Sequence, residues 1–282
     1  MAAHEANHIP DPLDHVLDDP QGNWEIFERL FGGFHLELPK IFGFQITKFM
    51  VLELLAAILI AAIFIPLCRR AHPGHLPRGA WWNAFESLLT FIRNEVARPN
   101  LGDHEADHYV PFLWTLFVFI LFLNLLGMIP FLGSPTANIS VTGGLAICSF
   151  LMIHGAAVAK MGPLHYLKSL WPHIDVPYMG PFVISPMVFL IELFGSVIKG
   201  VVLAIRLFAN MFAGHMVLAM ILTFIIVIGN AGYSHLWPVV TTASVLGVVA
   251  LSLLELFVAF LQAYVFVFLT ALFMGMALHP QH

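Results

Sequence analysis

Ionisable side chains lie inside the most apolar part of the chain, and this feature restricts the fold more than any other. Between Met187 and Ile228 the only formally charged residues are Glu192, Lys199 and Arg206. Placing an arginine in hydrocarbon costs about 2.5–3.5 kcal/mol on insertion scales. An arginine kept at that cost indicates a functional site inside a membrane protein.

The composition agrees with a membrane location. The chain of 282 residues is 59% hydrophobic and only 10% charged, whereas soluble domains are roughly 25% charged. Its net charge of −5 is confined to a few loops and termini, and no basic patch indicates a nucleic-acid partner. Cys68 and Cys148 lie at the end of one apolar run and inside another, which does not indicate a disulfide framework.

Five apolar runs are long enough to cross the roughly 30 Å of bilayer hydrocarbon, at residues 49–67, 110–131, 141–159, 187–228 and 239–278. As helices, the last two would be about 63 and 60 Å long. No proline or polar turn interrupts either run, so we expect a long, steeply tilted hairpin rather than four short spans. The predicted fold is an all-α integral membrane protein with five membrane crossings. His154, inside the third run, is expected to be a hydrogen-bonded helix-packing residue.

The distribution of charge around the first run predicts the orientation. The preceding segment is rich in Asp and Glu, whereas the following segment, residues 68–108, carries Arg69, Arg70, Arg78, Arg93 and Arg98. Basic segments stay on the cytoplasmic side, which places the N-terminus outside and, after five crossings, the C-terminus in the cytoplasm. We divide the chain into an external N-terminal segment, 1–45, and a single membrane domain, 46–282.

Residues 80–98 show apolar side chains at helical spacing. One face would carry Trp81, Phe85, Leu88, Ile92 and Val96. Paired tryptophans favour the membrane interface, so we expect an amphipathic helix lying flat there. The alternative is a packing helix in solvent.

His104–His108 spell H-E-x-x-H, the pattern with which zinc proteases place two histidine ligands and a glutamate base on one helix. Gly102 and Pro111 flank the pattern closely, which is an unfavourable context for such a helix. The longer version of this pattern, which includes a third histidine ligand, is absent from the sequence. We therefore expect no metal site.

The charged residues of the fourth run share one helix face. Relative to Arg206, Lys199 lies about 20° away, Glu192 and Asn210 about 40° away, and His215 about 180° away. Glu192 and Lys199 could simply neutralise each other near a membrane surface. Arg206 has no acidic residue within a turn or two, so that explanation does not extend to it.

Residues 206–215, RLFANMFAGH, resemble the signature of subunit a of the F-type ATP synthase, the membrane stator beside the rotating c ring. The similarity covers most of the chain from about residue 49 and extends to residues 109–130, 134–142, 191–206 and 253–273. The resemblance assigns the family's essential arginine to Arg206, its nearby asparagine to Asn210 and its conserved glutamine to Gln262. Glu192 and Lys199 match polar positions associated with the cytoplasmic half-channel.

Two positions depart from the enterobacterial pattern of that family. That pattern has Glu in place of His215 and His in place of Glu255, and the mitochondrial pattern shares the exchange seen here. The resemblance thus assigns both residues to proton translocation but leaves open which one hands the proton on. Glu255 and Gln262, seven residues apart, would lie on one helix face within about 20°.

The resemblance implies a non-catalytic, proton-conducting subunit in the cell (inner) membrane. Protons would enter through an outer half-channel, protonate a ring carboxylate and leave through a cytoplasmic half-channel. The implied partners are the c ring, subunit b of the peripheral stalk, the rest of the ATP synthase and the lipid bilayer, and no cofactor is implied. The sequence leaves open whether the ion is H⁺ or Na⁺ and how many c subunits there are.

Three other classes of function are alternatives: a secondary transporter, an intramembrane zinc protease and a helical scaffold. In a secondary transporter, Arg206 would bind an anionic substrate, but the chain lacks the internal repeat and the broken helices of many such proteins. An intramembrane zinc protease would use His104 and His108. A helical scaffold without a conducting role leaves the unpaired arginine unexplained.

Overall fold

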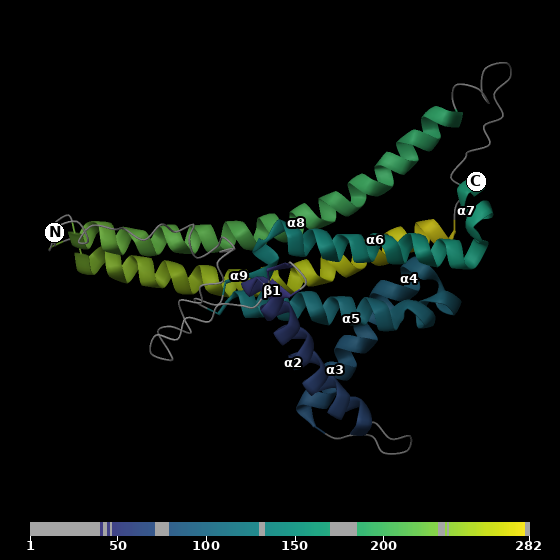
Figure 1. Cartoon of the computed structure of the whole chain (residues 1–282). Coiled ribbons are helices and arrows are strands. Elements are labelled where there is room, and N and C mark those ends of the chain that lie inside the picture. Colours follow the sequence, from purple (N-terminus) through teal and green to yellow (C-terminus); the bar gives the residue numbers. More distant parts are fainter. Residues whose placement is uncertain are drawn as a thin grey trace. The chain divides into compact units, whose positions relative to one another are not determined.

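A computed structural model describes residues 40–41, 44–45, 47–70, 79–129, 133–169, 185–230, 235 and 237–279. Its elements are β1 (Lys40–Ile41), β2 (Phe44–Gln45), α2 (Lys48–Arg70), α3 (Ala80–Phe91), the π-helix η1 (Ile92–Ala97), α4 (Arg98–Leu101), α5 (Asp103–Gly127), the 3₁₀ helix η2 (Pro135–Ala137), α6 (Ile139–Met161), α7 (Pro163–Ser169), α8 (Ser185–Asn230) and α9 (Trp237–Leu278) (Figure 1). The two short strands pair antiparallel. Most of the predicted N-terminal segment lies outside the described residues.

The prediction of an all-helical membrane fold is confirmed. Among the described residues, five helices are long and apolar enough to cross a bilayer, in α2, α5, α6, α8 and α9. Apart from the two-residue strands, every regular element of the described ranges is helical.

The two long apolar runs form unbroken helices, as predicted. α8 contains 46 residues and α9 contains 42, so at 1.5 Å per residue they are about 69 and 63 Å long. The C-terminal half of α8 and the N-terminal half of α9 lie side by side as a hairpin (Figure 1). At the tip, the Trp237 indole packs over Gly229, a position where a larger residue would crowd the ring.

The chain divides into two compact units, each built from separate stretches. One contains the residues up to Leu59, then Leu121–Val141 and Phe208–Leu261. The other contains Ile60–Ile120, Thr142–Leu207 and Gln262–His282. Each of the long helices therefore contributes one half to each unit.

In the unit containing the hairpin, Met211 of α8 and Ala137 of η2 form a buried apolar cluster, with Phe212 and Met216 packed against it. The side-chain amide of Asn124 is buried and donates a hydrogen bond to the Ala259 carbonyl, with an N–O distance of 3.1 Å. Such a bond offsets the cost of placing an amide in an apolar interior.

In the other unit, aromatic packing joins α2 to α3 and α5. The Phe64 ring meets Phe85 and Trp114 edge-on, with centroid distances of 5.2 and 4.5 Å. The start of α6 belongs to the unit that contains the hairpin. Asn138 precedes the helix, and its side-chain oxygen accepts a hydrogen bond from the backbone N–H of Ser140. This is the usual N-cap arrangement, which satisfies a donor the helix leaves free.

The amphipathic helix is observed, but not as one α-helix across residues 80–98. Residues 92–97 are π-helical, and Ile92, Val96 and Ala97 are all fully buried. A π-helix closes hydrogen bonds from i to i+5, so residues four and five apart both face the same side. In an α-helix, Ala97 would turn away from Ile92. The position of this helix at a membrane interface stays a prediction.

The H-E-x-x-H pattern is helical, contrary to the unfavourable context we inferred from its flanks. α5 begins at Asp103 and continues through Pro111. Gly102 adopts φ +83°, a conformation that favours glycine and turns the chain directly into the new helix. Asp103 and Glu105 lie in the first turn, where their negative charges interact favourably with the positive end of the helix dipole.

Candidate functional site

Arg206 lies near the middle of α8 and its side chain is exposed. The adjoining surface is apolar, with Val202 and Ile205 45% and 49% exposed. No described carboxylate of its own unit lies within salt-bridge distance. In a membrane, a guanidinium on such an apolar surface is costly, which makes Arg206 a candidate functional residue.

Asn210 follows Arg206 by one turn of α8. In the hairpin unit it lines a cavity of about 220 Å³ together with Gly214 of α8 and Glu255 of α9. Its side-chain nitrogen is buried and has no hydrogen-bond partner among the described residues. The rest of the lining is mainly aliphatic, so the few polar groups are concentrated at one place.

Glu255, which lines this cavity, lies close to His215. The His215 Nδ1 atom lies 3.9 Å from Glu255 Oε1, and the two side chains are 20% and 9% exposed. His215 Nε2 and Glu255 Oε1 also lack hydrogen-bond partners in the described part of the chain. The two residues that the family resemblance pairs are thus neighbours in this structure, on facing helices.

Gln262 lies on α9, seven residues after Glu255. It is 5% exposed, and its side-chain nitrogen has no described hydrogen-bond partner. Lys199 lies on α8 with its ammonium 5.2 Å from the centroid of the Phe273 ring, an arrangement that stabilises a cation. Glu192 belongs to α8, but its side chain lies outside the described residues.

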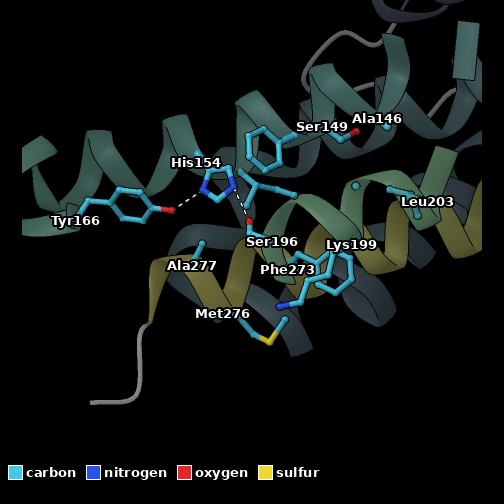
Figure 2. Close-up of a pocket in the computed structure, with 13 residues that line it drawn as sticks. Ala146, Ser149, His154, Tyr166, Ser196, Lys199, Leu203, Phe273, Met276 and Ala277 are labelled. Carbon is cyan, nitrogen blue, oxygen red and sulfur yellow. Dashed lines mark hydrogen bonds between the residues drawn. The ribbon is translucent and has the colours of Figure 1, made fainter. Parts of the chain in front are cut away.

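His154 is hydrogen-bonded through both ring nitrogens, which confirms its predicted role in helix packing. Nδ1 pairs with the Tyr166 hydroxyl, and Nε2 lies 2.8 Å from the Ser196 hydroxyl (Figure 2). Sequence reasoning singled out neither Tyr166 nor Ser196. Ser196 had a usable signal, since it is a polar residue within the apolar run of α8, close to Lys199.

His104 and His108 lie exposed on α5. Within the described ranges, no group of three or more His, Cys, Asp or Glu side chains is arranged to hold a metal ion. Glu105, the residue that would act as base in a zinc protease, forms an ion pair with Lys160. Asp107 accepts two hydrogen bonds from Arg93, each 2.7 Å long. Glu105 and Asp107 thus connect the first turns of α5 to α6 and to η1.

The fold and these sites define a class of protein. It is a multi-pass helical membrane protein with ionisable side chains on two very long helices, an exposed arginine on one of them and a polar cavity within their hairpin. This class includes membrane subunits that conduct ions.

A profile of the family described as "ATP synthase A chain" matches residues 50–275. Among individual relatives, "ATP synthase subunit a" of Myxococcus xanthus is 41% identical over 84% of this chain and 74% of its own length. "ATP synthase subunit a 2" of Chlorobaculum tepidum is 37% identical over 94% of this chain and 72% of its own length. The chain therefore belongs to the ATP synthase subunit a family.

Coverage differs among the relatives. The match to "ATP synthase subunit a" of Anaeromyxobacter dehalogenans, 39% identical, includes 82% of this chain but only 58% of the relative. The chain thus spans a little over half the length of that protein.

Proposed function

We propose that this chain is the proton-conducting subunit of an F-type ATP synthase and that Arg206 faces a ring of c subunits. The observation that carries the proposal is the exposed position of Arg206 on the apolar surface of an unbroken helix, with no carboxylate of the described residues of its unit in salt-bridge distance. A ring of carboxylates moving past this surface would supply the missing partner. The secondary-transporter and zinc-protease alternatives are not favoured by the family.

The chemistry of arginine suits this position. A ring carboxylate facing lipid is neutral, because desolvation disfavours the anion, whereas a nearby fixed cation favours the ionised form. A guanidinium cannot be deprotonated in a protein, so its charge stays fixed as each carboxylate arrives. The same charge repels protons that would otherwise pass straight between the two half-channels.

The cavity in the hairpin is the proposed outer half-channel. Its volume of about 220 Å³ exceeds several-fold the roughly 30 Å³ that one water occupies in the liquid. Asn210, His215 and Glu255 place unpartnered polar atoms at or beside it. Water bound to these atoms would provide a path for protons through otherwise aliphatic walls.

The other predicted residues keep the roles that the family resemblance implies. Gln262, buried on α9, would help to orient groups near the arginine. Glu192 and Lys199, which precede Arg206 on α8, would belong to the cytoplasmic half-channel. Ion conduction is then the whole contribution of this subunit, and ATP chemistry is left to the rest of the complex.

We further propose that the N-terminus faces outward and the C-terminus the cytoplasm, with subunit b of the peripheral stalk as a second partner. Helices of about 69 and 63 Å cannot stand upright in roughly 30 Å of hydrocarbon. The α8–α9 hairpin should therefore tilt well beyond the usual angle of about 20°.

Purification of the chain in its native complex tests the proposal. We expect it to co-purify with a ring of small two-helix subunits, and vesicles containing the complex to build a proton gradient on ATP hydrolysis. A chain that purifies without such a ring and drives substrate uptake in vesicles would be a transporter instead.

A further inference from the structure

We propose that Ser196, His154 and Tyr166 form a proton relay in the cytoplasmic exit path. The inference rests on the proton-conducting function proposed above and extends it to residues outside the family signature. It is supported by the geometry of a second cavity, whose lining shares no residue with the one that Asn210 and Glu255 line.

The three side chains form one continuous hydrogen-bonded chain within a single unit. Ser196 comes from α8, His154 from α6 and Tyr166 from α7 (Figure 2). The imidazole lies between the two hydroxyls, with one ring nitrogen bonded to each. A neutral imidazole has one donor and one acceptor nitrogen, so a proton arriving at one side can be matched by a proton leaving from the other.

Local backbone structure keeps the three hydrogen-bonded side chains aligned. Gly162 ends α6 with φ +82°, and the backbone N–H of Tyr166 then donates to the Gly162 carbonyl at 2.9 Å. This turn brings Tyr166 back beside His154. The Phe150 ring packs edge-on against the imidazole at a centroid distance of 4.1 Å and supports the ring in its position between the two hydroxyls.

The relay borders a cavity of about 100 Å³, lined also by Ser149, Lys199 and Phe273. The Ser149 hydroxyl is buried and has no hydrogen-bond partner among the described residues. Both the volume and the polar lining suit bound water. Ser196 precedes Arg206 by ten residues, about 15 Å along α8, so water in this cavity would lie on the cytoplasmic side of the arginine.

The proton transfer leaves no net change in the chain. A hydronium in the cavity gives a proton to Ser196 Oγ as the Ser196 proton passes to His154 Nε2. The proton on His154 Nδ1 passes to the Tyr166 oxygen, and the Tyr166 proton passes to water outside. The transfer leaves His154 as the other tautomer, with its proton on Nε2. Rotation of the imidazole ring, which exchanges the protonated and unprotonated nitrogens between the two hydroxyls, and reorientation of those hydroxyls then reset the relay. One proton enters and one leaves.

His154→Gln is the critical variant. A glutamine amide can donate to one hydroxyl and accept from the other, so it preserves packing and hydrogen bonds, but it cannot exchange protons as an imidazole does. We expect proton flux through ring-containing vesicles to fall by roughly 100-fold or more, in the range of general acid–base contributions. Tyr166→Phe should act in the same direction. The matched control is Thr115→Val, which removes an exposed hydroxyl that bonds the Pro111 carbonyl of its own helix, α5, away from the cavity of the relay, and should conduct normally.

Chemical rescue separates a relay from a packing role. In His154→Ala, added imidazole should restore a substantial part of the flux, with equal amounts of assembled complex confirmed by subunit stoichiometry. Normal flux in His154→Gln, or failure of imidazole to restore His154→Ala, would overturn the relay. If the unmodified complex itself conducts no protons, the proposed function fails; if it conducts and His154→Gln matches it, only the relay fails.

Discussion

His215 Nδ1 and Glu255 Oε1 lie 3.9 Å apart across the hairpin of α8 and α9, both largely buried. The distance is too long for a hydrogen bond but short enough for strong electrostatic coupling at low dielectric. A bridging water or a small side-chain rotation would let the carboxylate and the imidazole exchange a proton. What matters for conduction is then the pairing of the two groups rather than which helix carries which.

The first prediction exchanges the two residues. His215→Ala and Glu255→Ala should each slow proton-driven ATP synthesis markedly, because each leaves the other group without a charged neighbour. The double exchange, His215→Glu with Glu255→His, should retain more activity than either single replacement. Proton flux and ATP synthesis in vesicles measure the effect. A double exchange no better than the worse single variant would show that the two residues are not one relay.

The second prediction concerns Gly214. A Cβ atom at this position would lie 2.7 Å from Glu255 Oε1 and 3.2 Å from its Cδ. The end of a glutamate side chain can move aside, so Gly214→Ala should assemble normally but displace the carboxylate and reduce proton flux. Gly247→Ala on α9 is the control, since a Cβ there meets nothing within 4 Å. Equal flux in both variants would mean that the position of Glu255 is not critical.

The third prediction concerns stability. A Cβ atom at Gly275 would collide with the backbone carbonyl oxygen of Asn100, with its carbonyl carbon only 3.0 Å away. Backbone cannot yield as a side chain does, and overpacking costs about 1–3 kcal/mol. Gly275→Ala should lower the thermal midpoint of the complex, whereas Gly155→Ala, with open space around its Cβ, should not. Identical melting of the two variants would contradict the close contact.

The fourth prediction concerns the H-E-x-x-H pattern. Both histidines are exposed, and Glu105 is paired with Lys160. The double variant His104→Ala with His108→Ala should therefore keep full coupled ATP synthesis, and metal analysis of the purified complex should show no stoichiometric zinc in either form. Loss of zinc together with loss of activity would instead indicate a metal site.

The sequence predicted the helical architecture well because hydrocarbon imposes simple rules. An unbroken apolar run must be helical, since backbone groups in lipid have no water to bond, and both α8 and α9 follow that rule. The start of α5 was predicted too late, at residue 110 rather than Asp103. Hydropathy detects the apolar part of a helix and misses a polar first turn that extends beyond it.

The candidate site was predictable only in part. Charged residues in apolar runs, such as Arg206 and Glu255, can be recognised from the sequence alone. The relay of Ser196, His154 and Tyr166 was not, because it joins three helices and includes a turn at Gly162. Spacing along one helix gives no information about contacts between helices, so only the structure brings these hydroxyls to the imidazole.

Replacement of Arg206 is the decisive experiment on the proposed role of this arginine in coupling. In vesicles containing the assembled complex, ATP synthesis driven by an imposed proton gradient should be abolished in Arg206→Ala. Arg206→Lys should also fail largely, because an ammonium lacks the planar guanidinium and loses its proton more readily when desolvated. Substantial proton-coupled ATP synthesis by Arg206→Ala, at normal levels of assembled complex, would contradict the account.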